Sequence, residues 1–493
     1  MTARAILLFW LALPLAAAGP AARIQAFLDA SPAARAAFWG VRVVDLDQNR
    51  VVVDRNANRL FLPASNAKLF TTAMALMRLG ADYRFETRVL ADREPGSDGC
   101  VASIRLVGGG DPNLSGRAIP YRMNSPAGDP LEAIEDLARQ VIAHGVRCVN
   151  GDVVGDDTAY LWEPYPDGWG IDDSLWDYGA AVSALCINDN SLTVTVLPGE
   201  QANDLARIVL APPLEYYQID NRVRTAPRAE RKIVIDRLPG SGQLRIWGAI
   251  PPNDPGETDA LGIDDPALYA AYALRDALAR QGIAIRGEAR ARHLFPNEVA
   301  DLKSGPAPGP EPGVELARRE SPPLLEDLRI TDKVSQNLHA EMALRAVART
   351  RRHIGSREAG LAELQAFLDD AGIEHDTYTF ADGSGLSRLD LVSPATVVRL
   401  LTYLYRSPVR EQWMSLLPVG GRDGTLHARF AGSPAAGRIR AKTGSLSHVS
   451  ALSGYARRKN GKMLAFSILV NNYAGPASEV TAAIDRICRL MVE

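Results

Sequence analysis

The sequence lacks the features that mark several common classes of protein. Its formal charge is only -3 over 493 residues, so no excess of positive charge favours a nucleic-acid partner. It contains no Gly-x-Ser-x-Gly elbow, no His-Glu-x-x-His, no phosphate-binding loop and no complete Gly-x-Gly-x-x-Gly. The seven histidines are scattered, and the four cysteines do not have the spacing of a metal site. We therefore expect no nucleic-acid partner, no metal and no organic cofactor.

Long hydrophobic runs are also missing, apart from one near the N-terminus. An apolar run from Ala5 to about Leu15 follows Arg4 and precedes three small residues at 16–18. The run is shorter than the ~20 residues that span a bilayer, which favours a secretory signal peptide over a membrane anchor. We predict cleavage near Ala18 and export to the periplasm. No cysteine follows the run to carry a lipid, and the sequence does not indicate peripheral membrane contact.

The few cysteines leave their pairing open. Cys100, Cys148, Cys186 and Cys488 would all enter an oxidising compartment in an exported chain. Cys100 and Cys148 each begin a strand-like run that ends near Gly and Asp, which favours a disulfide between them. Four free, buried thiols are the alternative.

The two ends of the chain read as parts of one domain. The segment 38–64 predicts two β-branched strands around a turn, and Ser65 to about Leu79 has apolar residues at helical spacing that stop at Gly80. The segment 438–473 predicts strands joined by a turn at Asn460-Gly461, with a helix after them. Because mainly helical sequence fills the part after residue 313, we predict an α+β domain whose sheet combines strands from both chain ends.

The middle of the chain has a different character, with short strands, isolated helices and many Gly, Pro and Asp turns. The segments 137–153 and 274–289 share a pattern of helix, Gly, short strand and Gly, which suggests at least two substructures or a coincidence. A Pro/Gly run at 304–313 marks a boundary or an exposed loop. We predict a signal peptide, a split domain, and an inserted region of one or two smaller domains, two nested ones being favoured. Their boundaries are 1–18, 19–87 with 314–493, and 88–313.

Three short motifs carry the candidate chemistry: Ser65-Asn66-Ala67-Lys68, Ser335-Gln336-Asn337 and Lys442-Thr443-Gly444. Acyl transfer needs a hydroxyl nucleophile, a base, donors for the oxyanion and an acid for the leaving nitrogen. Residues three apart share one face of a helix, so the Lys68 amine can reach the Ser65 hydroxyl. A lysine, with a pKa of ~10.4, acts as a base only if it is desolvated or lies near another cation such as Lys442. Taken alone, the first motif fits a helix-capping serine and a solvated lysine better.

The order and context of the three motifs resemble the serine penicillin-binding proteins and β-lactamases. In those proteins a helix-borne Ser-x-x-Lys, a loop Ser-x-Asn and a strand Lys-Thr-Gly meet in one cleft. The long gap between the first two motifs is similar to the low-molecular-mass class C penicillin-binding proteins, peptidase family S13. Longer strings are also similar to signatures of that family, at 106–116, 335–345, 381–388 and 442–456. The resemblance implies a penicillin-binding-protein-like transpeptidase domain, with an antiparallel sheet and a helical region, split by the insertion.

The resemblance also implies a function. The expected activity is serine D-alanyl-D-alanine carboxypeptidase, with DD-endopeptidase action as a further expectation. Peptidoglycan stem peptides would be the substrates, and β-lactams would acylate the same serine. A serine β-lactamase and a non-catalytic peptidoglycan-binding protein are the alternatives. Rapid turnover of penicillin without D-alanine release would favour the first, and no acylation with an unaltered Ser65→Ala phenotype would favour the second.

The resemblance assigns roles to the motif residues. Ser65 is the expected nucleophile, Lys68 its proton acceptor, Ser335 the proton donor to the leaving amine, and Asn337 the ligand of the substrate amide and of Lys68. The terminal carboxylate would be bound by Lys442, Thr443 and Gly444, which fits the need of a carboxylate for a cation beside a hydroxyl. The backbone N–H groups of Ser65 and Ser445 would form the oxyanion hole. Gln336 departs from the family pattern, in which many members have Asp. We expect this difference to tune the activity, not to abolish it.

Two further residues are expected to read the side chain of the stem peptide. Arg388 matches the position that would bind the carboxylate of a diaminopimelate side chain, and Asp157 is a partner for its ammonium or a turn aspartate. A set of aromatic residues would either line that side of the cleft or, as we favour, form the core of an inserted domain: Trp162, Tyr165, Trp169, Trp176 and Tyr178. His339 and His448 lie beside motif residues, and we expect supporting or surface roles for them.

Overall fold

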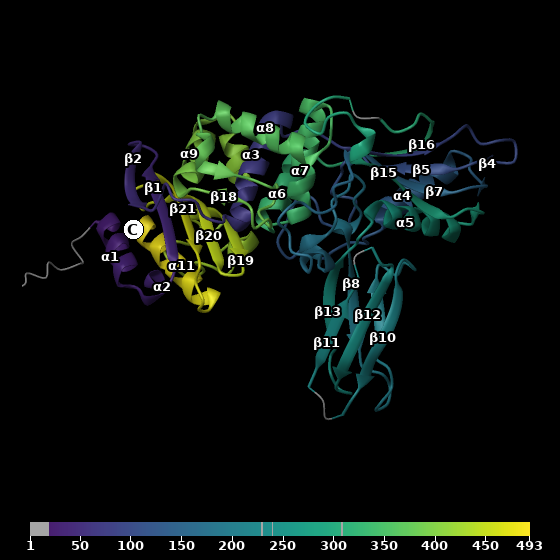
Figure 1. The fold of residues 1–493 in the computed structure, drawn as a ribbon, viewed down its shortest axis with the longest axis horizontal. Helices are drawn as coiled ribbons and strands as arrows, with labels where there is room; N and C mark the ends of the chain where they lie inside the picture. The colour runs from purple at the N-terminus through teal and green to yellow at the C-terminus, as the bar shows by residue number, and fades with distance from the viewer. Residues whose placement is uncertain (1–18, 228–229, 239, 307–308) are drawn as a thin grey trace, which may run out of the picture.

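A five-stranded antiparallel sheet joins the two ends of the chain (Figure 1). The computed structural model describes residues 19–227, 230–238, 240–306 and 309–493, and the predicted signal peptide lies outside them. The strands in sheet order are β19 (Ile439–Leu446), β20 (Val449–Arg457), β21 (Met463–Asn471), β1 (Phe38–Asp45) and β2 (Arg50–Arg55). The central neighbours β21 and β1 come from opposite ends of the sequence. The expectation that both ends build one sheet is therefore confirmed.

Helices cover both faces of this sheet. Alternate side chains of β1, such as Val41 and Val43, belong to the apolar layer on one face, while Val44 belongs to the layer on the other. The first face packs against α1 (Pro20–Ala30), α2 (Pro32–Arg35) and α11 (Ala477–Val492). The helical layer on the other side contains α3 (Lys68–Leu79), α6 (Leu324–Lys333), α7 (Asn337–Arg352), α8 (Arg357–Asp370), α9 (Pro394–Arg406) and α10 (Arg410–Leu416).

The chain leaves this domain after α3 and returns before α6. Strand β3 (Glu86–Ala91) spans the first predicted boundary, strand β16 (Val314–Glu320) begins at the second, and the two strands pair in antiparallel fashion. They belong to a mixed sheet that continues with β5 (Ile104–Val107), β7 (Val153–Leu161) and β15 (Ala289–Leu294). The α+β fold split by a large inserted region is thus confirmed, and the entrance and exit of that region lie side by side.

The two similar segments of the middle region lie side by side in one layer. In the first, α4 (Glu132–Ala143) leads to β6 (Cys148–Val149) and β7; in the second, α5 (Pro266–Arg280) leads to β14 (Ala284–Ile285) and β15. Their strands pair in parallel, β6 with β14 and β7 with β15, and α4 contacts α5. The two segments therefore belong to one part of the inserted region.

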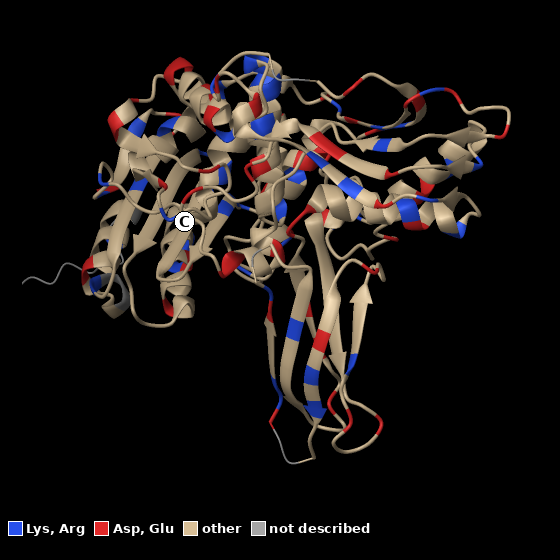
Figure 2. Cartoon of the chain, turned by 45° about the vertical axis from the view of Figure 1, so that its right-hand side comes forward, with Lys and Arg blue, Asp and Glu red and all other residues tan. Residues whose placement is uncertain are grey.

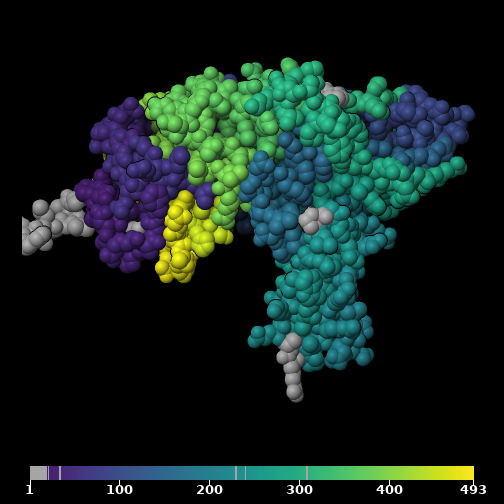
Figure 3. Space-filling view, in the orientation of Figure 1, coloured from purple at the N-terminus to yellow at the C-terminus, as the bar shows by residue number. Residues whose placement is uncertain are grey.

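A second part of the insertion projects from this layer (Figures 1 and 3). It contains two three-stranded sheets, one of β9 (Arg207–Ala211), β8 (Ser191–Leu197) and β13 (Glu257–Gly262), the other of β10 (Gln218–Thr225), β12 (Gln243–Ile250) and β11 (Lys232–Asp236). Both lie between β7 and α5 in the sequence, so this part is nested within the first. Acidic and basic residues are interspersed over the view in Figure 2, without a face of one sign.

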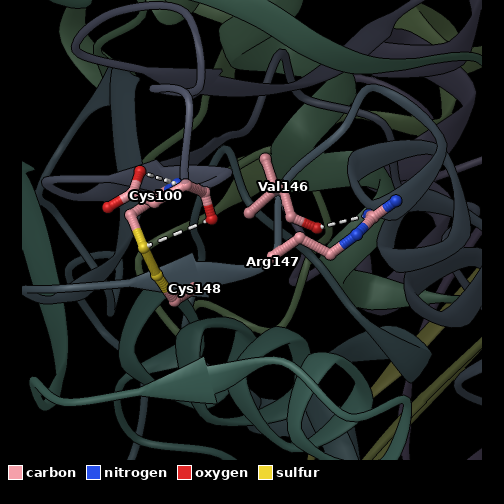
Figure 4. Close-up of a disulfide and its surroundings, with 5 residues drawn as sticks. Cys100, Val146, Arg147 and Cys148 are labelled. Carbon is pink, nitrogen blue, oxygen red and sulfur yellow. Dashed lines mark hydrogen bonds between the residues drawn. A yellow bond between two sulfur atoms is a disulfide. The ribbon is translucent and has the colours of Figure 1, made fainter.

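The disulfide that the sequence favoured is present. Cys100, in β4 (Cys100–Val101), and Cys148 in β6 face each other in paired parallel strands, with Cα atoms 4.6 Å apart (Figure 4). Cys186 and Cys488 are free and buried. The bond therefore links two strands of the inserted region that the sequence separates by 48 residues.

Candidate active site

Ser65 lies in a tight turn that leads directly into α3. The turn is a 3-10 segment, Ala64–Ala67, and Ala64 has a φ of 47°, a strained value for a residue with a side chain. Gly385 and Gly444 pack against this turn from two sides. A Cβ on Gly385 would lie 1.9 Å from the Ala64 carbonyl oxygen, and one on Gly444 would lie 2.7 Å from that of Pro63. Two glycines thus allow the backbone to approach closely around the serine.

Lys68 is fully buried and its amine has three hydrogen-bond partners. Nζ lies 2.9 Å from Ser65 Oγ, 2.6 Å from Asn337 Oδ1 and 2.6 Å from the Ser384 carbonyl oxygen. The last two atoms can only accept hydrogen bonds. A neutral amine has two hydrogens, so these go to Asn337 and Ser384, and its lone pair is left for the Ser65 hydroxyl. Neither the turn nor α3 has a side-chain cap, and Lys68 is buried, so the alternatives of a capping serine and a solvated lysine are both excluded.

The charge state of Lys68 is also shifted towards a base. Burial lowers the pKa of Lys68 to about 8, although the carboxylates of Asp382 and Glu341 favour the charged form. At neutral pH a useful fraction of the amine is then unprotonated, which a lysine in water does not offer. The lowered pKa and the 2.9 Å contact make Lys68 suited to accept a proton from Ser65.

Ser335 and Lys442 form a second pair beside the first. Ser335 has a φ of 66° in the turn between α6 and α7, and its Oγ accepts a hydrogen bond of 2.8 Å from Lys442 Nζ. Lys442 also donates to the Thr443 carbonyl oxygen at 2.9 Å. Burial, and the positive charge that Lys68 carries when it is protonated, lower the pKa of Lys442. We refer to Ser65, Lys68, Ser335, Asn337 and Lys442 as the catalytic cluster.

Asn337 connects the catalytic cluster to the inserted region. Its Oδ1 accepts from Lys68, and its Nδ2 donates to the Tyr178 carbonyl oxygen at 2.8 Å. Trp169, in the same loop as Tyr178, donates its indole N–H to Asp382 at 2.9 Å. The loop that contains both aromatic residues is therefore a wall of the site.

The segment 381–388 is organised by one buried carboxylate. Asp382 accepts hydrogen bonds from the backbone N–H groups of Ser384, Gly385 and Ser387, and from the Ser384 hydroxyl. These bonds fix the turn that presents the Ser384 carbonyl to Lys68. Arg388 ends the segment on the surface, and its guanidinium contacts the Ser447 carbonyl oxygen at 3.3 Å, beyond the end of β19.

Strand β19 holds the remaining motif residues along the edge of the sheet. Thr443 Oγ1 donates to Thr425 Oγ1 at 2.9 Å, and Ser445 is exposed. Asn66, next to the nucleophile, donates to the Lys442 carbonyl oxygen at 3.0 Å and ties the strand to the turn. The strand thus presents a cation, a hydroxyl and free backbone beside Ser65, as a carboxylate-ended peptide requires.

Gln336 and His339 belong to a second buried group. Gln336 donates to Asp189 Oδ2 at 3.1 Å, and His339 lies 3.1 Å from Asp189 and 2.7 Å from Asp327. Arg117 also pairs with Asp189. We call Arg117, Asp189, Asp327 and His339 the paired cluster. The side-chain amide of Gln336 donates to Asp189, whereas an aspartate at position 336 would place a carboxylate beside the carboxylate of Asp189. This contact explains why position 336 departs from Asp.

The paired cluster keeps its charges. Burial lowers the pKa of His339, but the nearby carboxylates of Asp327 and Asp189 outweigh it and raise the pKa to about 9. The partners His339 and Arg117 hold the pKa of Asp189 below its usual range despite burial. The supporting role expected for His339 fits this arrangement. His448, by contrast, is exposed, and its Nδ1 is hydrogen-bonded to the Tyr473 carbonyl oxygen at 2.8 Å.

Asp157 is not brought to the catalytic cluster by any bond among the described residues. Its side chain is buried, with one oxygen accepting from Ser183 at 2.8 Å and the other lying 3.0 Å from His293 Nδ1. The aromatic set is likewise divided. Trp176 packs against the core of the inserted region, as favoured, whereas Trp169 and Tyr178 contact the site.

Three groups near the catalytic cluster escaped the sequence analysis. The Ser384 carbonyl is a backbone group without a residue-type signal, and Thr425 pairs with Thr443 from a distant turn. Asp332, one turn before Ser335, is buried and accepts from Thr72 at 3.1 Å. An acidic residue three positions before Ser335 was the only sequence feature that could have pointed to Asp332. Among the described residues, no cluster of His, Cys, Asp and Glu could hold a metal ion, and no helix is long and apolar enough to cross a membrane.

Comparison with known proteins adds the family context. A profile of the D-Ala-D-Ala carboxypeptidase 3 (S13) family matches residues 21–490. The chain is similar to a D-alanyl-D-alanine carboxypeptidase of Actinomadura sp. (strain R39), with 36% identity over 92% of this chain and 81% of that protein. It is also similar to D-alanyl-D-alanine carboxypeptidase DacB of Haemophilus influenzae, with 26% identity over 87% of this chain and 84% of that protein.

A solved structure shares the fold. The crystal structure of penicillin binding protein 4 from Haemophilus influenzae superimposes with a TM-score of 0.79 and 24% identity, covering 95% of this chain and 98% of that one. The same protein complexed with a β-lactam gives a TM-score of 0.74. The split α+β architecture is therefore that of a penicillin-binding protein.

Proposed function

The chain belongs to the D-Ala-D-Ala carboxypeptidase S13 family, and on that premise we propose that it releases D-alanine from peptidoglycan stem peptides through a Ser65 acyl-enzyme. One observation carries the proposal for the site. The Lys68 amine is held by Asn337 and Ser384 so that its free electron pair faces the Ser65 hydroxyl 2.9 Å away.

The first step is acylation. Neutral Lys68 takes the proton of Ser65 as Oγ attacks the carbonyl carbon of the bond between the two D-alanines. The backbone N–H groups of Ser65 and Ser445 stabilise the oxyanion. Ser335, hydrogen-bonded to Lys442, passes a proton to the leaving amine of the terminal D-alanine. The proton that Lys68 took from Ser65 replaces the one that Ser335 gave, so Lys68 is neutral again and the ester on Ser65 remains.

The second step is hydrolysis of the ester. A water molecule gives a proton to neutral Lys68 and attacks the ester carbonyl carbon. Lys68 then passes that proton to Ser65 Oγ as the ester bond breaks, which releases the shortened peptide and restores the Ser65 hydroxyl. An amine beyond the D-alanyl bond, as in a cross-link, would leave by the same route, which is DD-endopeptidase action. Mass analysis of products from whole muropeptides separates the two outcomes.

Substrate recognition follows from the charged and polar edge of β19. Lys442, Thr443 and the backbone at Gly444 are suited to the terminal carboxylate of D-alanine, and Thr425 orients the Thr443 hydroxyl. Arg388, exposed beyond the end of β19, is suited to a carboxylate on the side chain of the stem peptide. Asp157 is not retained as a direct ligand, because His293 and Ser183 occupy both of its oxygens.

The same chemistry accounts for β-lactams as covalent inhibitors, because a β-lactam carbonyl presents an acyl group and a nearby carboxylate to Ser65. The related Haemophilus influenzae protein has been crystallised with a β-lactam. Export to the periplasm by a signal peptide at residues 1–18 completes the proposal, since peptidoglycan lies outside the inner membrane.

The test is acylation and peptide cleavage by the purified protein. Wild type should be labelled by fluorescent penicillin on the peptide that contains Ser65 and should release D-alanine from a pentapeptide, whereas Ser65→Ala should do neither. Rapid penicillin turnover without D-alanine release would identify a β-lactamase instead. Absence of labelling and of D-alanine release in the wild type would leave a non-catalytic peptidoglycan-binding protein.

A further inference from the structure

A cavity of about 560 Å³ lies in the inserted region, where its two parts meet. Its lining comes from segments far apart in the sequence: the loop after β7, the segment before β10, the connection from β11 to β12, the residues around the start of α5 and the end of β15. The catalytic cluster contributes nothing to this lining. The cavity is therefore separate from the site at Ser65.

Aromatic side chains form much of its wall. Trp162, Tyr165, Tyr216 and Tyr272 all line it, and Trp162 stacks on His293 with ring centroids 3.9 Å apart. Tyr216 is held edge-on to Tyr272 at 5.6 Å. Within the part of the chain that the structure describes, no protein group is hydrogen-bonded to the indole N–H of Trp162 or to the hydroxyls of Tyr165 and Tyr272. The wall thus combines rigid apolar faces with polar groups available to a ligand.

The charged groups of the lining neutralise one another. Arg237 donates to the Tyr217 hydroxyl at 2.6 Å and lies 3.8 Å from Asp264. His293 lies 3.4 Å from Asp265 and is anchored from behind by Asp157. The lining therefore carries two paired cations and two carboxylates, so it offers no net charge to a phosphate, an oligocation or a free carboxylate. A neutral ligand with apolar faces and many hydroxyl groups fits this chemistry.

The cavity is connected to the catalytic cluster through one loop. Trp162, Tyr165 and Ser174 line the cavity, while Trp169 and Tyr178 in the same loop bond to Asp382 and Asn337. One loop therefore contributes both to the wall of the cavity and to the wall of the site at Ser65. In peptidoglycan, the group attached to the stem peptide is a chain of uncharged N-acetylated sugar rings.

We propose that this cavity binds a sugar ring of the glycan strand that carries the stem peptide. The inference rests on the proposed function, since it supposes that peptidoglycan is the substrate. The aromatic faces of Trp162, Tyr165 and Tyr272 stack on the ring, and their free N–H and O–H groups, with the carboxylates of Asp264 and Asp265, bind its hydroxyls. The cavity then favours stem peptides still attached to glycan over free peptides.

The experiment compares two substrates of the full mature protein, a free pentapeptide and the same peptide attached to a disaccharide. Tyr165→Ala is the test variant, because Tyr165 is 37% exposed and makes no described side-chain hydrogen bond. We expect kcat/KM for the attached peptide to fall about tenfold, chiefly through KM, with no change for the free peptide. Trp247→Ala is the matched control, since Trp247 is 40% exposed on β12 and lies outside this cavity.

A binding measurement supports the kinetics without catalysis. Soluble N-acetylglucosamine oligosaccharide should quench tryptophan fluorescence in wild type and in Ser65→Ala, and Tyr165→Ala should weaken this binding. Equal loss on both substrates would show that the cavity holds peptide, and unchanged kinetics and binding would show that it holds no sugar. Either result would overturn the inference. Failure of the proposed function would differ, because wild type would then not cleave the free pentapeptide.

Discussion

Two buried polar clusters lie at the start of α7, and they shift the pKa values of their basic groups in opposite directions. In the catalytic cluster, two lysines share one site and burial lowers the pKa of both. In the paired cluster, a histidine and an arginine meet carboxylates that keep them charged. Asn337 belongs to the first and Gln336, its neighbour, bonds to the second. The Ser335-Gln336-Asn337 motif thus contacts both clusters: the catalytic cluster, whose Lys68 is suited to exchange a proton, and the paired cluster, whose ions stay charged.

The largest effect is expected from a substitution in the catalytic cluster alone. Lys68→Met removes the base, and we expect the rate of acylation by fluorescent penicillin to fall about 10²–10⁴-fold, with the fold retained. In wild type, the same rate should rise with pH through about 8, because only the neutral amine accepts a proton. A stopped-flow acylation series from pH 6 to 10 measures both. A rate that is flat over this range would contradict the role of Lys68.

The next prediction concerns the stability that the paired cluster contributes. Because the pKa of His339 is raised from about 6.5 to about 9, the folded state binds this proton more tightly than the unfolded state. The contribution, about 3 kcal/mol, is full below pH 6.5 and is lost as pH rises through 9. Asp327, Asp189 and Arg117 surround this group.

Urea unfolding of wild type and His339→Gln at pH 6 and pH 9 isolates the effect. His293, whose pKa is also raised, contributes equally to both proteins and cancels in the difference. The stability gap between the two proteins should be wide at pH 6 and narrow at pH 9. The two clusters would then respond oppositely to alkali, one gaining rate and the other losing stability; a constant gap would refute the assignment.

The smallest expected effect is at the residue between the clusters. Gln336→Asp keeps the acceptor for the Leu338 N–H, which caps α7, but places a carboxylate against Asp189. We expect the free energy of unfolding to fall by about 1 kcal/mol, with acylation little changed. In an Asp189→Asn background the penalty should vanish, and a double-mutant cycle measures this coupling. Equal penalties in both backgrounds would show that the two side chains do not interact.

The sequence predicted the parts of the site that short motifs encode. Ser65 with Lys68 is a local relation on one turn of chain, and the Lys-Thr-Gly strand is found by its residue types. The Ser384 carbonyl could not be found this way, because its place depends on the bonds of Asp382 and on Trp169 from the inserted region. Asp157 shows the same limit, because its partner His293 lies on the neighbouring strand of the sheet but 136 residues away in the sequence.

The five-stranded sheet beside Ser65 can form only after the C-terminal strands have been synthesised. Strand β1 pairs with β21, and Gly444 of β19 packs against the nucleophile's turn, so neither contact exists until the last strands have been made. The sheet of β3 through β16 needs nothing beyond residue 320. As a chain emerges from its N-terminus, the insertion can therefore fold first, in line with domains generally folding as units. Catalytic competence arrives last, when the newest strands close around a serine that was made long before.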